Sequence, residues 1–381
     1  MGVARSLHMS IGEHADLGEY ERSPPASVVA AMAEAGLFRL GTPAVYGGGE
    51  ADPLTIIEVL ETVAAADGAI GWTLMVGLEA GLVVAALDPA AATALTGDHP
   101  DLVMCGSFAP GGRATPTEDG LVVTGRWPYA SGCTVADYFC GGSLIVDADG
   151  CVQRTSDGAP LVRQVLVPRA DYTIDETWNA AGLSATGSHD VVIDKAHVAS
   201  DRVIDIYGGG MRVDAAPYRL PLPIRLSFSK VGVATGIARH ALDLFTTVAT
   251  EKTPVGSRTA LRESPGVQLA LADAETRLRS GRAFVLDTVR AVWDAVLNDR
   301  PIPREDRTML RLACASCCRD AVTAVDLVAA QAGMAASTGP PAFTRAIRDV
   351  RVVAQHFWVA PAAIADAGRA LLGLEPVTPG F

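Results

Sequence analysis

The sequence predicts a mostly α-helical protein with a central β domain, because its hydrophobic pattern changes twice along 381 residues. Apolar residues recur at helical spacing up to about residue 101, form short strand-like runs over residues 102–205, and return to helical spacing in long segments from about residue 220. We therefore expect three domains, at residues 1–101, 102–210 and 211–381. Because 49% of the residues are hydrophobic, we also expect a large buried interior.

The N-terminal part is expected to hold two clear amphipathic helices. Residues 26–37 and 53–66 carry apolar side chains at i, i+3, i+4 and i+7, with Gly36 and Gly68 placed as stops. Between them lies the glycine-rich stretch TPAVYGGGEAD. It has no GxGxxG spacing and no strand before it, so a turn is favoured over a phosphate site.

The middle part contains five short runs of the kind found in strands. They are LVMCGSFA, GLVVTGRWPYAS, YFCGGSLIVDA, PLVRQVLVP and DVVIDKAHV. Gly, Pro and Asp clusters separate the runs, and this pattern predicts a small antiparallel β domain.

The C-terminal part predicts an up-and-down helical bundle, with long helices at residues 225–249, 265–297, 304–333 and 343–360. A short helix is expected to begin at Pro361, because proline lacks an amide hydrogen and disfavours helical geometry at the residue before it. His356 would then lie in the last turn before this break. Its spacing from Asp349 and Val352 predicts that the imidazole points into the interior.

Charge and composition exclude several classes of function. The net charge is −12, only three lysines occur and no basic run is present, so nucleic acid is not an expected partner. The most apolar segment, residues 75–87, is interrupted by Glu79 and is shorter than the roughly 20 residues that span a bilayer. Residues 1–20 lack a signal-peptide core. We expect a cytoplasmic protein that does not enter a membrane.

Cysteine usage indicates reduced thiols rather than disulfides, because the seven cysteines are odd in number and lack framework spacing. Cys314, Cys317 and Cys318 lie in a helical run without a nearby histidine, which favours small buried residues over a metal site. No His and carboxylate pair has metal-ligand spacing, so we expect no metal. GxSxG and P-loop motifs are also absent.

Three stretches carry a family resemblance: GRWPYASGCTVADYF, ETWNAAGLSATGSHDVVIDKAHV and RAIRDVRVVAQHF. Together they resemble the acyl-CoA dehydrogenase superfamily, and most closely its flavin-dependent monooxygenases of two-component systems. The resemblance implies an N-terminal helical domain, a middle antiparallel β-barrel and a C-terminal four-helix bundle. It also implies O2 and reduced FMN or FAD, supplied by a separate flavin reductase as a diffusible flavin.

In such proteins the flavin ring lies between the β domain and the bundle, which suggests a role for the PYASG motif. Ser131 matches a position that faces the polar edge of the flavin, where a hydroxyl can bond N5 or a carbonyl. Trp127 and Tyr129 would wall the site. The alternative is that all three are ordinary residues of a β hairpin.

Two further stretches are expected to contact the flavin on the same grounds. Ser107 and Phe108 match a strand end that contacts the cofactor in relatives. Thr186, Gly187 and Ser188 would form a tight turn rich in backbone donors, although such a turn can also satisfy its own hydrogen bonds.

Lys252 stands where acyl-CoA dehydrogenases carry an arginine that reaches the adenosine part of FAD on a neighbouring subunit. The surrounding segment, EKTPVGSR, departs from that pattern, as does QAGMAASTG at residues 331–339. These departures favour a loosely held reduced flavin over a permanently bound FAD.

The position that holds the catalytic glutamate in many acyl-CoA dehydrogenases is Phe357 here, and phenylalanine cannot accept a proton. The neighbouring His356 suits oxygen chemistry instead, because imidazole can stabilise or protonate a flavin C4a peroxide near neutral pH. The alternative is a core histidine bonded to a carbonyl. His189, beside the GLSATGS turn, is the next histidine of interest.

We therefore expect a monooxygenase that hydroxylates a small aromatic or amine-bearing substrate through a flavin C4a-hydroperoxide. His356 and Ser131 are its expected catalytic residues. Two alternatives stay open: a flavin-linked desaturase that resembles acyl-CoA dehydrogenases, and a non-catalytic binding protein on the same scaffold. The apolar bundle faces predict a homodimer or homotetramer.

Overall fold

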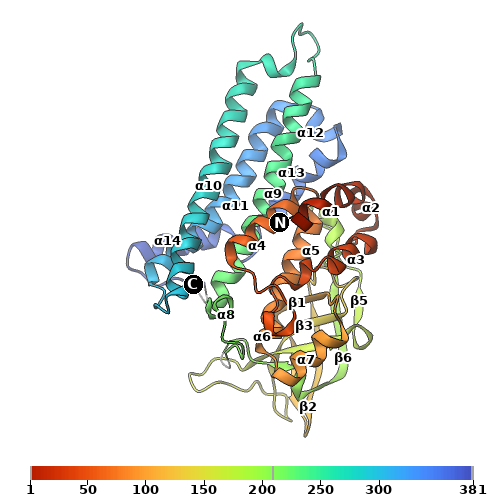
Figure 1. Ribbon diagram of the computed structural model, residues 1–381, viewed down its shortest axis with the longest axis vertical. Coiled ribbons are helices and arrows are strands. Elements are labelled where there is room, and N and C mark those ends of the chain that lie inside the picture. The colour runs from red at the N-terminus through yellow and green to blue at the C-terminus, as the bar shows by residue number, and fades with distance from the viewer. Residues whose placement is uncertain (1, 208–209, 379–381) are drawn as a thin grey trace.

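The computed structural model of the chain describes residues 2–207 and 210–378. It has helices at both ends of the sequence and one sheet between them, and Figure 1 shows the bundle extending away from the sheet. We propose domain boundaries at residues 101 and 210. The last N-terminal helix ends at Asp98 and the last strand ends at Ile204, so both boundaries fall in connecting segments.

The N-terminal region forms more helix than the sequence pattern predicted. The predicted helices appear as α3 (Ala26–Glu34) and α4 (Pro53–Ala64). Asp52 caps α4 by accepting hydrogen bonds from the amides of Leu54 and Thr55. Further helices are α1 (Gly2–Glu13), α2 (Ala15–Glu21), α5 (Gly68–Glu79), α6 (Gly81–Ala86) and α7 (Pro89–Asp98).

The glycine-rich loop between α3 and α4 is a compact turn. Gly47 has a φ of 78°, and a Cβ on Gly48 would lie 2.1 Å from the carbonyl oxygen of Thr42. Glycine is therefore required there by the fold of the loop itself.

The β domain is a seven-stranded sheet with the order β5-β6-β2-β1-β3-β4-β7. Its strands are β1 (Met104–Pro116), β2 (Gly120–Trp127), β3 (Tyr138–Ile145), β4 (Val162–Pro168), β5 (Thr173–Asp175), β6 (Asp190–Ala199) and β7 (Val203–Ile204).

Two expectations about this sheet were wrong. Strands β1 and β3 are parallel, although the remaining pairs are antiparallel. The cause is residues 128–137, which carry the chain from β2 on one side of β1 to β3 on the other side; we call this segment the crossover. In addition, the pairings among the described residues leave β5 and β7 as edges, so they do not close into a barrel.

The sheet is covered on both faces. On one face α6 and α7 pack through Val83 and Leu95 against a cluster that includes Tyr138 and Leu166. On the other face Trp127 and Phe139 pack with small residues of the crossover (Ala130, Cys133 and Ala136). The crossover is thus held against the core of the β domain.

The bundle consists of α9 (Leu222–Glu251), α10 (Pro265–Leu297), α11 (Arg304–Ala332) and α13 (Pro341–Val353), with short helices α8 (Ala216–Arg219), α12 (Ala335–Thr338) and α14 (Pro361–Leu371). Pro361 is the first residue of α14, as predicted. However, α13 ends at Val353 instead of continuing to residue 360, because the chain turns there, with the amides of Val359 and Ala360 bonding the carbonyl of His356.

Helices α4 and α5 pack against α9 and join the N-terminal region to the bundle. Among the described residues, the stretch Gly68–Ala86 alone is long and apolar enough to cross a membrane, but 89% of that window is buried inside the protein. This stretch is therefore part of the protein core, and it is divided at Ala80 into α5 and α6.

Candidate active site

The crossover brings Ser131 to the junction of the three regions. Tyr129 and Gly132 on either side have φ values of 61° and 78°, so the backbone turns sharply at the serine. The amide of Gly132 donates to the carbonyl of Thr186 over 2.8 Å, and the amide of Ala130 donates to the carbonyl of His189 over 3.0 Å. These bonds fasten the crossover to the turn that precedes β6.

Four buried side chains from three segments form a continuous line of hydrogen bonds, which we call the hydroxyl chain. Trp72 Nε1 of α5 lies 3.0 Å from Ser131 Oγ, which lies 2.7 Å from Ser188 Oγ. Ser188 Oγ is 2.6 Å from Thr186 Oγ1, and Thr186 Oγ1 is 2.8 Å from the carbonyl oxygen of Leu183. The two serines and the threonine proposed from the sequence are therefore in direct contact.

The direction of the hydroxyl chain is fixed at both ends. An indole N–H can only donate and a carbonyl can only accept, so Trp72 donates to Ser131 and Thr186 donates to Leu183. Each hydroxyl has one hydrogen. Because Thr186 has given its hydrogen to Leu183, Ser188 must donate to Thr186, and Ser131 must donate to Ser188.

His356 meets the start of this chain. Its ring stands edge-on to the indole of Trp72, with 5.4 Å between the ring centroids. It does so from the turn after α13 and not from a helix face, so the helical-spacing argument from Asp349 and Val352 was wrong. The half-buried imidazole nevertheless reaches the junction.

The proton on His356 can be assigned from its contacts. The amide of Trp358 donates to Nδ1 over 3.4 Å, so a neutral ring carries its hydrogen on Nε2. Burial, and secondarily the charge of Lys230, hold the pKa of His356 well below its usual value. The imidazole is therefore neutral near pH 7 and offers Nε2–H as a hydrogen-bond donor.

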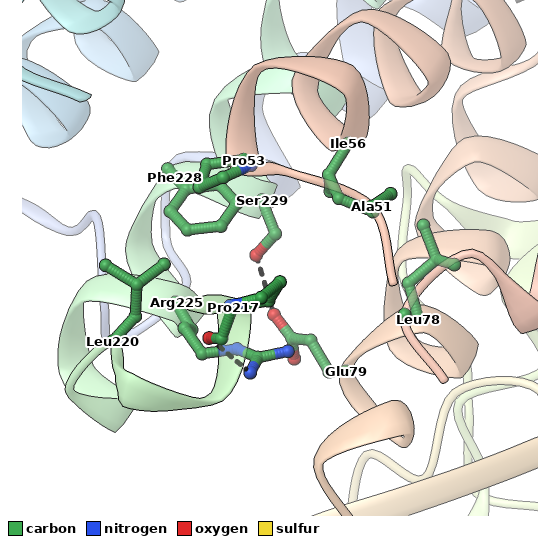
Figure 2. Close-up of a pocket in the computed structure, with 11 residues that line it drawn as sticks. Ala51, Pro53, Ile56, Leu78, Glu79, Pro217, Leu220, Arg225, Phe228 and Ser229 are labelled. Carbon is green, nitrogen blue, oxygen red and sulfur yellow. Dashed lines mark hydrogen bonds between the residues drawn. The ribbon is translucent and has the colours of Figure 1, made fainter. Parts of the chain in front are cut away.

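A pocket lies between α4, the end of α5 and the start of α9 (Figure 2). Its cavity volume is about 30 Å³, and the figure rises to about 460 Å³ only when the space open to solvent is counted. Apolar walls come from Ile56, Leu78, Leu220 and Phe228. Glu79 on the pocket wall is seven residues after Trp72, so about 10 Å along one face of α5 separates the pocket from the hydroxyl chain.

Two charged side chains, Glu79 and Arg225, line the pocket. Glu79 accepts hydrogen bonds from Ser229, over 2.6 Å, and from the fully buried Lys230, so its charge is matched. Arg225 points across the pocket toward Glu79 (Figure 2) and donates to the carbonyl of Pro217 over 2.9 Å.

Arg225 brings a second positive charge close to Glu79, whose carboxylate attracts it but is already bonded by Lys230. Its guanidinium lies over the Tyr218 ring, 5.2 Å from the centroid. Within the described residues no carboxylate forms an ion pair with it. Burial lowers the pKa of Arg225 to about 10, which still leaves it charged at neutral pH.

Behind the hydroxyl chain, Asp349 of α13 fastens the turn before β6. Its Oδ1 accepts from the amide of Leu183 over 2.6 Å, and Leu183 has a φ of 51°. Burial, and then the nearby Asp67 carboxylate, raise the pKa of Asp349 to about 7. A Cβ on Gly182 would lie 2.5 Å from the carbonyl oxygen of Arg348, so the turn and α13 are in close backbone contact.

The structure places some sequence-predicted residues away from the junction. Trp127 is 0% exposed and donates to the carbonyl of Gly142, so it is a core residue and not a wall of the site. It lies there because Gly112, Gly125 and Gly141 leave room for the indole. Tyr129 is 71% exposed and stands edge-on to Trp178.

Ser107 and Phe108 lie in the middle of β1, where the register shifts, and Phe108 packs against the cluster under α6 and α7. Lys252 caps the C-terminal end of α9, which in Figure 1 is the end farther from the sheet, and its Nζ donates to the carbonyl of Ala332 over 2.7 Å. The contacts of these three residues do not include the hydroxyl chain. Gly187, with a φ of 51°, forms the turn between Thr186 and Ser188.

The remaining candidates have structural partners. His189 Nδ1 accepts from the amide of Trp178 over 3.1 Å. Cys314, Cys317 and Cys318 are buried, and burial raises their thiol pKa values, as expected for core thiols. Within the described residues, no group of three His, Cys, Asp or Glu side chains is placed to hold a metal ion.

Sequence reasoning missed Trp72, the Glu79–Lys230 pair and Asp349. A signal existed for the pair, because each charge interrupts an apolar helical run and a buried charge requires a partner. A signal also existed for Trp72, since a tryptophan within an apolar helix still has an N–H to satisfy. Asp349 had no such signal, because its partner is a backbone amide 166 residues away.

Comparisons with protein families match both helical regions. The model described as acyl-CoA dehydrogenase, N-terminal domain, matches residues 3–91, and the model described as acyl-CoA dehydrogenase, C-terminal domain, matches residues 229–361.

Curated relatives span nearly the whole chain. An indole-3-acetate monooxygenase from Pseudomonas putida is 32% identical over 378 residues, covering 97% of this chain and 93% of that protein. The oxygenase component of an FADH2-dependent resorcinol hydroxylase from a Rhizobium strain is 28% identical over 377 residues, covering 94% and 90%.

Solved structures show the same fold. XiaF from Streptomyces sp., in complex with FADH2 and glycerol, has a TM-score of 0.91 and 25% identity, covering 100% of this chain and 96% of that chain. A 3-HSA hydroxylase from Rhodococcus sp. RHA1 has a TM-score of 0.89 and 24% identity, covering 100% and 98%.

Proposed function

This chain belongs to the acyl-CoA dehydrogenase superfamily, as an oxygenase component of two-component flavin-dependent monooxygenases, and from this premise we propose that it hydroxylates a small aromatic acid. The observation that carries the proposal is the convergence of Ser131, Trp72 and His356, about 10 Å along α5 from a pocket lined by Arg225. Its cofactor is a reduced flavin, and O2 is its second substrate.

The residues at the junction fit the polar edge of a flavin. That edge presents N–H groups and carbonyl oxygens, so it needs both acceptors and donors. Ser131 Oγ receives one hydrogen and gives one, which leaves a lone pair free to accept, and His356 offers Nε2–H. When bound, the reduced flavin would supply two electrons to activate O2, and O2 would supply the oxygen atom that enters the substrate. We propose that this transfer follows the course that the family resemblance implies.

His356 is proposed to steady negative charge on oxygen during this reaction. A neutral Nε2–H donor in a half-buried site stabilises such charge without giving up its proton. The lowered pKa of His356 therefore favours the donor role over protonation by an imidazolium, which the sequence had left equally open.

The substrate is proposed to occupy the pocket of Figure 2. Its apolar walls suit an aromatic ring, and the Arg225 guanidinium suits a carboxylate, which it can bind with two parallel hydrogen bonds. An amine-bearing substrate is less suited, because the Glu79 carboxylate is already bonded by Lys230 and Ser229. Two of the relatives, the indole-3-acetate monooxygenase and the resorcinol hydroxylase, are also named for aromatic compounds.

A separate flavin reductase is the partner that the family implies, and we propose that reduced flavin reaches this chain by diffusion. A cytoplasmic location and a dimeric or tetrameric assembly are further parts of the proposal. The desaturase alternative loses support at the site, because Phe357 replaces the expected base and Glu79 is held by Lys230.

The test is the coupling of flavin oxidation to product in His356→Ala. Removing one donor to an oxyanion costs about 10²- to 10³-fold in rate. Reduced flavin should still react with O2, so flux should divert from product to hydrogen peroxide. Product and peroxide per flavin oxidised are measured with aromatic acids, and His8→Ala, at an exposed position on α1, is the matched control.

Wild-type coupling in His356→Ala would show that this histidine is a structural residue. If the wild-type chain itself forms no product with aromatic acids and a reductase, the binding-protein alternative is favoured instead.

A further inference from the structure

The fixed direction of the hydroxyl chain has a chemical consequence for the group that meets Ser131. All three hydroxyl hydrogens are committed, from Ser131 to Ser188, from Ser188 to Thr186, and from Thr186 to the Leu183 carbonyl. With its remaining lone pair Ser131 can therefore accept one more hydrogen bond, but it has no hydrogen left to donate.

The two redox states of a flavin differ at the atom concerned. N5 carries a hydrogen in the reduced ring and is a bare acceptor in the oxidised ring. An acceptor opposite N5 therefore matches the reduced state and leaves the oxidised state without a partner.

We propose that Trp72, Ser188 and Thr186 are positioning residues that hold Ser131 as an acceptor and so make this chain select reduced over oxidised flavin. The inference rests on the proposed function, because it requires the flavin edge to lie at Ser131. It adds a reason for the selectivity: to serve oxidised flavin, Ser131 must withdraw its hydrogen from Ser188. That leaves two buried oxygens facing each other over 2.7 Å without a hydrogen between them.

The size of the effect follows from one buried hydrogen bond. We expect this one bond to favour reduced flavin by about 10-fold beyond any other contribution, which is equivalent to about 1.4 kcal/mol. A 10-fold change in the affinity ratio corresponds to about 30 mV in the midpoint potential of a two-electron couple.

Substitutions at the two ends of the hydroxyl chain are expected to have different effects on flavin binding. The Trp72 end therefore serves as the control for the Ser188 and Thr186 end. Ser188→Ala removes the acceptor of Ser131, and Thr186→Val removes the acceptor of Ser188. Either change frees a hydrogen for Ser131 to donate, so the ratio of Kd for oxidised FMN to Kd for reduced FMN should fall about 10-fold.

Trp72→Phe changes the other end. It removes a donor to Ser131 but leaves every hydroxyl pointing the same way, so the preference for reduced FMN should persist or increase. Thr186→Ser keeps the hydroxyl and should restore the wild-type ratio. A merely structural role would weaken both FMN states together and would leave the ratio unchanged.

The measurements are anaerobic binding of oxidised and dithionite-reduced FMN, and the midpoint potential of bound FMN, with thermal unfolding as a check of each variant. The inference is overturned if Ser188→Ala and Thr186→Val bind FMN with the wild-type ratio, or if Trp72→Phe lowers the ratio as they do. If the wild-type chain binds neither state, the proposed flavin site itself is wrong. That result is distinct from binding with an unaltered ratio.

Discussion

At the scale of single residues, Arg225 is the side chain that we propose selects the molecule bound in the pocket of Figure 2. Arg225→Gln should weaken binding of indole-3-acetate by about 10- to 100-fold, because a buried charge-assisted pair is lost. Indole has the same ring without the carboxylate, so its affinity should change little. Equilibrium binding of both probes to wild type and variant measures the difference.

Tryptamine, which carries the opposite charge on the same ring, should bind wild type more weakly than either probe. Arg290→Gln, at an exposed position on α10, changes the net charge equally and serves as the control. An equal loss for indole and indole-3-acetate would mean that Arg225 supports the pocket through Pro217 and Tyr218 rather than binding a carboxylate.

The sequence placed single residues well where a motif fixed the local backbone and poorly where packing decided. Ser131, Thr186 and Ser188 were expected near one another, and they are hydrogen-bonded. Trp127 was expected in the site on its position beside PYASG, but β alternation turns it into the core of the β domain. Side chains at neighbouring positions of a strand point to opposite faces of the sheet. The motif alone does not reveal which face Trp127 takes.

At the scale of elements, the contact between α13 and the turn before β6 depends on the charge of Asp349. Asp67, Arg345, Arg348 and, across the same small cavity, His240 are the charged or titratable groups around it. Because the folded pKa of Asp349 is about 7, above that of an unfolded aspartate, the folded protein holds a proton there that the unfolded chain releases. This contribution to stability is complete below about pH 4 and is lost as the pH rises through 7.

Asp349→Asn keeps the acceptor for the Leu183 amide and removes the titration. Relative to this variant, the wild-type free energy of unfolding should fall between pH 5 and pH 8, by at most about 4 kcal/mol. Urea unfolding of both proteins at several pH values measures the difference. Asp349→Ala, which leaves the amide without a partner, should be less stable than Asp349→Asn by about 1–3 kcal/mol at every pH. Parallel pH profiles for wild type and Asp349→Asn would contradict the assignment.

The sequence predicted the ends of helices well where the local pattern decides them and poorly where the backbone bends. The sequence predicted α10 at residues 265–297, where a long periodic pattern and a first-turn proline agree with the structure. It extended α13 by two turns, because the apolar spacing continues through Val359 although the backbone bends after Val353. The parallel pairing of β1 and β3 also had no local signal, since strand order depends on where the crossover passes.

At the scale of the whole molecule, exposed aliphatic side chains favour assembly of several copies. The bundle region leaves large apolar residues in solvent: Val255, Leu269, Leu297, Met334, Leu371 and Leu372. We expect light scattering to give two or four times the mass of one chain at micromolar concentration. A monomer under these conditions would remove the basis for placing Lys252 near a neighbouring subunit's cofactor.

The long reach of the Asp349 to Leu183 bond also bears on how the protein is made. A ribosome releases the β domain well before α13, so a partly synthesised chain carries Ser131 and the turn before β6 without Asp349 to fasten that turn or His356 to face it. The groups proposed to handle oxygen are all present only once residue 356 of the 381 has been added.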